Sequence, residues 1–433
     1  MGRGRRLLTL MHQFLSDIDG RTAAIWLIAV GSIVLVLVRP RGLPEAWWAA
    51  AGACLLVLCR LFSAASAMHA VGKGVDVYLF LIGMMLMSEL ARREGVFDWV
   101  AGHAVAASKG SRSRLFLLVY SVGSVVTIFL SNDATAVVLT PAVLAAVRKA
   151  KAEPLPYLLI CAFIANAASF VLPISNPANL VVYSSGMPSL GRWLLTFGIP
   201  STASIVTTFL ILRWMSNKML VGPVHNDGKL EPLSVTGKLT LWGIGFLALT
   251  LMTASALNLD LGLPAFVAGV LVAGGVSWRD HNTPKDIVKE ISWSVLPLVA
   301  GLFVIVEAIN GAGALDLSVH LLKTISNWEP LAGALTSGFG IAVISNLMNN
   351  LPSGLIGGAA VKAAAITGPL RDAILIGVDL GPNLSVTGSL ATILWLMAIR
   401  REGLEIGFWK FLKWGIVVMP PALGVALWAT LIR

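Results

Sequence analysis

The stretch Ile376-Gly-Val-Asp-Leu-Gly-Pro-Asn-Leu-Ser-Val-Thr-Gly-Ser-Leu390 interrupts an apolar run that resumes over residues 391–397. A helix that crosses a bilayer is not expected to carry Gly381-Pro382 at its centre, because proline removes a backbone donor and glycine loosens the backbone. In lipid, such a break survives only where protein or a wet cavity satisfies the freed backbone groups. Asp379 lies at the break, and an acid at bilayer depth indicates a functional site. Broken helices of this kind are typical of secondary transporters.

The composition of the chain indicates a protein embedded in the lipid bilayer. Its 433 residues are 57% hydrophobic and only 12% charged, whereas soluble proteins carry roughly 25% charged residues. Many of the apolar runs are long enough for a helix to cross a hydrocarbon core of about 30 Å. The net charge of +10 comes from basic residues in short loops between these runs. Such loops orient membrane proteins, so we expect no nucleic-acid partner.

Motifs for catalysis, cofactors and metals are missing from the sequence. Cys54, Cys59 and Cys161 all lie in apolar runs, which indicates neither a disulfide framework nor a metal site. The six histidines have no metal-ligand spacing. No GxxxxGK[ST] motif occurs, so the chain is not expected to hydrolyse ATP itself. We therefore predict a transporter without a cofactor, and not an enzyme.

Two halves of the chain repeat the same plan. A gap-free match joins Gly83, Glu89, Gly95 and Asp98 of the first half to Gly301, Glu307, Gly313 and Asp316 of the second. The predicted segments are an N-terminal tail (1–22), a first repeat (23–215) with a hairpin (113–148) and a broken helix (156–184), a linker (216–237), and a second repeat (238–433) with a hairpin (331–369) and a broken helix (372–399).

Charge predicts how these segments are oriented. Both feet of the first hairpin are basic, which places them in the cytoplasm; the residues are Arg112, Arg114, Arg148, Lys149 and Lys151. If the second hairpin opens outward, most of the 32 Lys and Arg residues lie inside. We therefore predict an all-α polytopic membrane protein made of two inverted repeats, each with transmembrane helices, a re-entrant hairpin and a broken helix, as in alternating-access transporters.

The two hairpin tips carry candidate substrate-binding residues. At the first tip, Ser131, Asn132 and Thr135 can cap free backbone groups or contact a substrate. The alternative is that this tip is a loop outside the membrane. The second tip offers the hydroxyl and amide groups of Ser345, Asn346, Asn349 and Asn350. There the alternative is that the asparagines bond across a helix interface and have only a structural role.

The two helix breaks supply further candidates. Asn176 and Asn179 in the first break, and Gly388 and Ser389 in the second, are predicted to help line the substrate site.

The acids of the central segments are candidates for ion coupling. Asp133 and Asp379 are the acids within the hairpins and breaks, and burial favours the protonated form of an uncompensated carboxylate. We predict that they couple transport to protons, although each can also simply cap a helix end. Glu89 and Glu307 lie outside these breaks and are interpreted as structural.

The motifs resemble a known family, the ArsB-type arsenite and antimonite efflux transporters of the ion transporter superfamily. The similarity covers nearly the whole chain after residue 22 and is carried by three stretches: Ser131-Asn-Asp-Ala-Thr-Ala-Val-Val-Leu-Thr-Pro141, Ser345-Asn-Leu-Met-Asn-Asn-Leu-Pro-Ser353, and the stretch from Ile376 to Thr392. The family pattern at the third stretch reads close to CDLGPKxTPxGSLAT. The resemblance implies a scaffold domain and a transport domain with two opposed hairpins.

Two positions depart from this family pattern. Familiar members have an acid where this chain has Asn166 or Ala167, and a lysine where it has Asn383. One acid and one base are missing together, which suggests that a charge pair has been dropped.

The resemblance implies export of arsenite and antimonite across a bacterial inner membrane. Arsenous acid is neutral at physiological pH, so it needs hydrogen-bond partners, and the predicted asparagine- and serine-rich pocket has few charges. Proton antiport through Asp133 or Asp379 is the predicted energy source, and a soluble ArsA-type ATPase, found with some members, is a further candidate partner. The alternatives are a sodium/proton antiporter of the same superfamily and a passive channel for neutral solutes.

Overall fold

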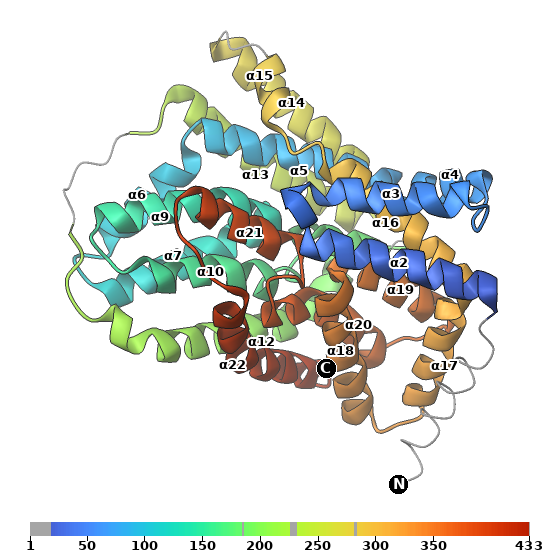
Figure 1. Cartoon of the computed structure of the whole chain (residues 1–433). Helices are drawn as coiled ribbons and strands as arrows, with labels where there is room; N and C mark the ends of the chain where they lie inside the picture. Colours follow the sequence, from blue (N-terminus) through green and yellow to red (C-terminus); the bar gives the residue numbers. More distant parts are fainter. Residues whose placement is uncertain (1–18, 184–185, 226–231, 281–283, 433) are drawn as a thin grey trace.

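The chain folds into a bundle of helices (Figure 1). The computed structural model describes residues 19–183, 186–225, 232–280 and 284–432. Within these ranges, the only strand-like pairing is an isolated antiparallel bridge between Ser111 and Pro223. Eight helices of the described residues are long and apolar enough to cross a membrane, or nine if two helices that bend by 48° at Gly74 form one span. The predicted all-α polytopic fold is therefore confirmed.

Six helices flank the central segments and pair across the two halves of the chain. We call them the flanking helices: α2 (Gly20–Val38), α3 (Glu45–Leu58), α5 (Val75–Arg93), α13 (Val235–Ala256), α14 (Gly262–Asp280) and α16 (Val295–Ile309). Helix α5 packs against α14, and α16 packs against α3. A Cβ atom at Gly83 would lie 2.3 Å from the carbonyl oxygen of Ala265 on α14, and one at Gly301 would lie 2.7 Å from the carbonyl carbon of Ala49 on α3. The two glycines that match between the repeats thus allow the same kind of close helix contact.

Two hairpins and two broken helices form the centre of the molecule. The first hairpin consists of α7 (Arg112–Phe129), α8 (Asn132–Ala134), a π-helical segment (Thr135–Leu139) and α9 (Thr140–Lys149); the second consists of α18 (Pro330–Met348) and α19 (Asn350–Ala363). The broken helices are α10 (Pro154–Ala167) with α11 (Pro177–Val182), and α20 (Pro369–Leu380) with α21 (Leu390–Arg401). The remaining helices are α4 (Ala64–Lys73), α6 (Val96–Ala107), α12 (Leu190–Ser216), α15 (Pro284–Glu290), α17 (Leu315–Ser326) and α22 (Phe408–Ala429).

Each hairpin brings its two feet together. In the first, the Arg112 guanidinium Nη2 donates to the carbonyl oxygen of Lys151 at 3.2 Å. In the second, Pro330 and Ala364 from opposite feet line one cavity of about 410 Å³. The second hairpin turns at Asn349, whose φ of 78° and ψ of 155° lie outside the helical region.

Several helix ends differ from the predicted segments. Helix α4 was not expected from the sequence, because its amphipathic residues follow a polar turn at Ser63 and are too few to span a bilayer. Helix α15 was not expected either, because it lies in a polar stretch of the second repeat, outside the predicted hairpin and broken helix. Helix α13 begins at Val235, where the Ser234 hydroxyl accepts from the Gly237 N–H, so the helix extends into the predicted linker. The predicted tail overlaps residues 1–18, which lie outside the described part of the chain.

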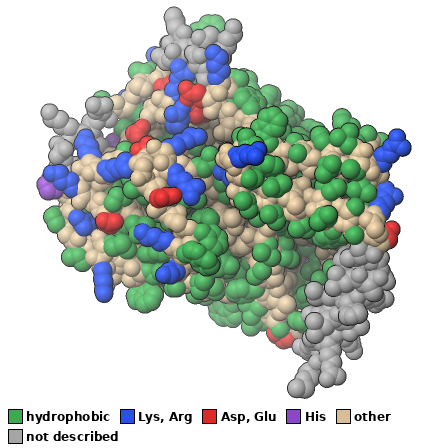
Figure 2. Space-filling view, in the orientation of Figure 1, with side chains coloured by type: hydrophobic (Ala, Val, Ile, Leu, Met, Phe, Trp, Pro, Cys, Tyr) green, Lys and Arg blue, Asp and Glu red, His purple; other side chains and the backbone are tan. Residues whose placement is uncertain are grey.

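Hydrophobic and basic side chains occupy different parts of the surface. Figure 2 shows hydrophobic side chains over much of one face, while Lys and Arg side chains gather toward the left of the view. Leu195 on α12, Trp242 on α13 and Leu271 on α14 are all exposed, as expected of helices whose outer sides contact lipid rather than water. The chain is therefore a multi-pass membrane protein, and the inverted orientation of its halves stays a prediction.

Cysteine labelling is expected to test that orientation directly. Lys151 lies at the foot of the first hairpin and Asn327 precedes the foot of the second, and both side chains are exposed. If the hairpins open to opposite sides, an impermeant thiol reagent added outside intact cells should label Asn327→Cys and leave Lys151→Cys unmodified. Labelling of both positions from one side would contradict the inverted topology.

Candidate functional site

The two helix breaks contact each other through buried amide and hydroxyl groups. The Asn166 amide Nδ2 donates to the Asn383 Oδ1 at 3.0 Å, and the Ser389 hydroxyl donates to the Asn166 Oδ1 at 3.1 Å. The Asn383 Nδ2 in turn donates to the carbonyl oxygen of Phe163 at 3.0 Å. Asn166 is one of the two positions considered for the missing acid, and Asn383 is the position of the missing lysine. The two side chains are hydrogen-bond partners, and both are neutral amides.

Asp379 lies within this crossing and is fully buried. Its Oδ2 accepts from the Ser169 hydroxyl at 2.8 Å, and its Oδ1 accepts from the Asn176 amide Nδ2 at 2.9 Å. None of the ion pairs found among the described residues includes Asp379. Because both donors are neutral, no opposite charge among the described ion pairs balances the Asp379 carboxylate when it is ionised.

Other polar residues of the breaks bond to backbone groups that the breaks leave free. The Asn179 amide Nδ2 donates to three carbonyl oxygens, those of Ser169 at 2.9 Å and of Leu172 and Pro173 at 3.3 Å. A Cβ atom at Gly388 would lie 2.5 Å from the Cα of Pro382, so a larger residue does not fit there. Asn179, Gly388 and Ser389 thus stabilise the breaks, and none of them lines the cavities described below.

The first hairpin tip presents Ser131, Asn132 and Asp133 to cavities, and Ser131 and Thr135 also bond locally. The Ser131 hydroxyl accepts from the Ala134 N–H at 3.1 Å and caps the return helix. The Thr135 hydroxyl lies 2.8 Å from that of Thr127 in the opposite arm. Asn132 is only 2% exposed, its Oδ1 has no partner among the described residues, and it lines a cavity together with Asp133.

At the second hairpin tip, too, some residues bond to neighbouring segments, and Asn350 lines a cavity. The Asn346 amide Nδ2 donates to the Gly381 carbonyl oxygen at 2.8 Å, and its Oδ1 accepts from the Ser385 hydroxyl at 2.7 Å. Asn346 therefore fastens the hairpin to the second break, and Ser345 bonds to Ser353 at 2.7 Å in the opposite arm. The Asn349 Oδ1 accepts from the N–H of Leu351 at 3.3 Å.

A small cavity lies between the two tips. It measures about 10 Å³, which is room for about one water molecule. Each central segment contributes to its wall, and the polar residues that line it are Asn132, Asp133, Asn176 and Asn350. The structure thus brings these four predicted residues together, in a conformation in which the gap between the tips is nearly closed.

A larger cavity of about 80 Å³ continues from this gap toward the surface. The two cavities share Leu81, Asp133, Pro177 and Val295 as lining residues. At its other end the larger cavity reaches Glu89 on α5 and Glu290 at the end of α15. We call the small cavity between the tips the tip cavity. Asp133 therefore lies where the tip cavity meets the larger cavity, whereas Asp379 lines neither of them.

Several polar residues of this arrangement were not predicted as site residues from the sequence. Ser169 bonds to Asp379, while Ser88, Glu290 and Ser292 line the larger cavity. Ser169 follows Asn166 by one helical turn, which is a signal that could have placed it beside the break. Glu290 and Ser292 lie in a polar connection between two apolar runs, so only the tertiary structure shows that they face a cavity.

Comparison with known proteins agrees with this architecture. Residues 33–399 match the citrate transporter family, CitMHS. The chain is 28% identical to an arsenical pump membrane protein of Escherichia coli and 29% identical to that of Escherichia coli strain K12, in both cases over 94% of this chain and 97% of the relative. The crystal structure of the Alcanivorax borkumensis YdaH transporter has a similar fold, with a TM-score of 0.57 and 15% identity over 87% of this chain and 89% of that one.

The match covers both hairpins and both helix breaks, and the relatives align along nearly their whole length. The chain therefore belongs to the citrate transporter family, as a membrane transporter that resembles the ArsB-type arsenical pump membrane proteins.

Proposed function

We propose that the protein exports arsenite, and also antimonite, from the bacterial cytoplasm across the inner membrane in exchange for protons. The proposal is carried by one observation, the charge of the larger cavity. Its lining includes the carboxylates of Asp133, Glu89 and Glu290, and none of the described lining residues is Lys, Arg or His. Such a lining repels anions and accepts neutral or cationic solutes.

This charge separates candidate substrates that the comparisons leave open. Citrate, after which the family is described, carries several negative charges at physiological pH and would need basic partners. Arsenous acid is neutral and offers three hydroxyl groups. The unpartnered Asn132 Oδ1 can accept from one of them, and the Asn350 amide can donate to another. The lining therefore favours the neutral trihydroxide over citrate.

The same acidic lining also favours a second candidate function, sodium/proton antiport, because carboxylates and amide oxygens bind hard cations. Arsenite accumulation in everted membrane vesicles, with and without an uncoupler, tests the choice. Export of arsenite by proton antiport predicts accumulation that the uncoupler abolishes. Proton movement that depends on sodium and ignores arsenite would support the antiporter. Arsenite flux that the uncoupler leaves unchanged would indicate a passive channel.

The tip asparagines are expected to affect arsenite transport in two distinguishable ways. Asn350 lines the tip cavity, so Asn350→Ala should remove a substrate partner, costing about 1–3 kcal/mol. That cost corresponds to an apparent affinity about five- to 150-fold weaker. Asn349 caps α19, so Asn349→Ala should cut transport and also lower stability by about 1 kcal/mol.

Initial rates of arsenite uptake and melting curves in detergent measure the two effects separately. Asn327→Ala, at an exposed position far from the tips in sequence, is the matched control. Normal transport by both tip variants would show that these amides are not substrate ligands.

A further inference from the structure

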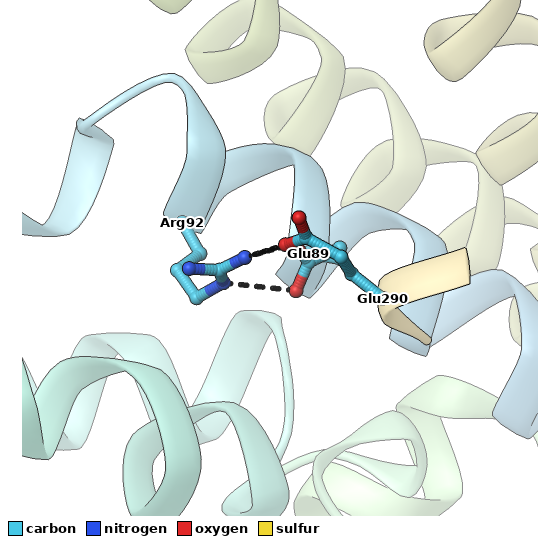
Figure 3. Close-up of polar contacts among 3 residues, drawn as sticks. All are labelled: Glu89, Arg92 and Glu290. Carbon is cyan, nitrogen blue, oxygen red and sulfur yellow. Dashed lines mark hydrogen bonds and ion pairs between the residues drawn. The ribbon is translucent and has the colours of Figure 1, made fainter. Parts of the chain in front are cut away.

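Two carboxylates and one guanidinium form a cluster at the outer end of the larger cavity. The Arg92 Nε donates to the Glu89 Oε2 at 2.9 Å, and its Nη2 donates to the Glu89 Oε1 at 2.5 Å. The same Nη2 also donates to the Glu290 Oε2. Figure 3 shows Glu89 and Arg92 on one turn of α5, with Glu290 reaching them from the other side. We call these three residues the collar.

The collar lies where the cavity meets the surface. The Glu290 side chain is 52% exposed and that of Glu89 is 12% exposed, so Glu290 lies at the mouth and Glu89 lies deeper. Both line the cavity, whereas Arg92 does not. The cavity then runs past Ser88 and Ser292 to Asp133. A solute that follows this route meets the collar first.

The charges of the collar do not cancel toward the cavity. Two carboxylates face one guanidinium, which leaves one net negative charge, and that guanidinium is already engaged by both oxygens of Glu89. Arg93 also acts electrostatically on Glu290, but it is not among the lining residues. Apolar walls, here Phe80 and Met84, concentrate the field of such charges within a cleft. An anion in the cavity is therefore destabilised, whereas a neutral or cationic solute is not.

We propose that Glu89 and Glu290 are specificity-determining residues, which make this cavity an entry route that rejects anions such as arsenate, phosphate and citrate and admits neutral hydroxylated solutes and cations. Arg92 is a positioning residue that holds the two carboxylates together. This inference rests on the proposed function in one respect: it takes the larger cavity as the route of the transported solute.

Thiol labelling with charged reagents tests the collar without any transported substrate. Ser292→Cys places a thiol in the cavity wall at an exposed position. The exposed Cys54 and Cys59 are first replaced by serine, and the buried Cys161 is kept. The probes are a cationic and an anionic methanethiosulfonate of similar size. Their rate ratio at the cavity thiol, divided by the ratio at free cysteine, reports the local potential.

We expect the cationic reagent to be favoured in the Ser292→Cys protein. One charge at about 4 Å in water changes the rate of each reagent by about fivefold, in opposite directions for the cation and the anion. Each carboxylate removed in Glu89→Gln and Glu290→Gln should therefore lower the ratio by about 25-fold. Arg92→Gln should raise the ratio, because it removes the positive member. A purely structural role for the cluster would not give opposite signs. Glu307→Gln, the repeat-matched position paired with Lys73 outside the cavity, should leave the ratio unchanged.

A ratio that stays the same in the Glu89→Gln/Glu290→Gln double variant, with the protein still monodisperse in size-exclusion chromatography, would overturn the proposal.

Uptake in everted vesicles gives an independent test. Arsenate or citrate in excess should not slow arsenite uptake by the wild type, and should slow it in Glu89→Gln/Glu290→Lys. If those anions compete equally in both proteins, the collar does not exclude anions. If the wild type takes up no arsenite, the proposed function is wrong. The labelling ratio, which does not depend on arsenite transport, then still tests whether the collar selects solutes by charge.

Discussion

Replacing Asp379 with alanine is expected to abolish transport and to destabilise the protein by about 2–5 kcal/mol, because the change leaves two buried donors unpaired. These donors are the Ser169 hydroxyl and the Asn176 amide, which come from the first broken helix and bond to an acid of the second. The loss therefore affects the contact that joins the two breaks. Melting of the purified protein in detergent measures the stability, and uptake in proteoliposomes measures the transport.

Asparagine at position 379 separates the structural role of this acid from a role in proton coupling. It keeps the shape of the side chain and one acceptor oxygen, so we expect the Asp379→Asn protein to assemble. It cannot take up a proton, so arsenite-driven proton flux in proteoliposomes should fall to the background of empty vesicles. Asp98→Asn on α6, an exposed position, is the control and should keep full flux. Full flux in Asp379→Asn would leave Asp379 with a structural role only.

Asp133→Asn is expected to abolish uphill export while leaving arsenite exchange down its gradient. Asp133 lines both the tip cavity and the larger cavity, so a proton or a solute that passes between them meets its carboxylate. We propose that a proton on Asp133 and arsenous acid between the tips displace each other. The neutral amide still offers hydrogen bonds to arsenous acid, but it cannot exchange a proton with the cavity.

Counterflow of labelled arsenite and arsenite-dependent proton flux, measured in the same proteoliposomes at several pH values, test this expectation. Preserved counterflow with lost proton flux supports it. Loss of both would instead indicate that Asp133 binds the substrate. If Asp133→Asn and Asp379→Asn both keep full proton flux, neither acid couples transport to protons. Glu89 and Glu307 would then be the next candidates.

The two acids differ in a way that the sequence alone does not reveal. The sequence motif is most complete around Asp379, which makes that acid the more prominent candidate. In the structure, both oxygens of Asp379 accept hydrogen bonds within the helix crossing, and Asp133 is the acid that faces the cavities. A sequence motif identifies a candidate residue, whereas the groups that surround this residue in the structure decide whether it can contact a solute.

The sequence by itself determined the class of the protein and the places where its helices break. Long apolar runs require membrane helices, and Gly381-Pro382 or an asparagine cluster within such a run requires a break, because the backbone there cannot complete its hydrogen bonds. These signals are local, so they can be recognised without knowing the packing. The structure has turns near Ser131 and Asn349, and the assignment of these turns to the tips of re-entrant hairpins stays a prediction.

Only the tertiary structure decided which polar residues face a cavity and which bond to each other. Asn346 and Asn350 belong to the same short motif, but Asn346 is engaged by the second break and Asn350 lines the gap between the tips. Glu290 meets Arg92 across 198 positions of the chain, a separation over which no pattern in the sequence predicts contact. Side chains of one type have the same hydrogen-bonding capacity at every position. What each one does is set by the groups that folding places around it, and those groups come from distant parts of the chain.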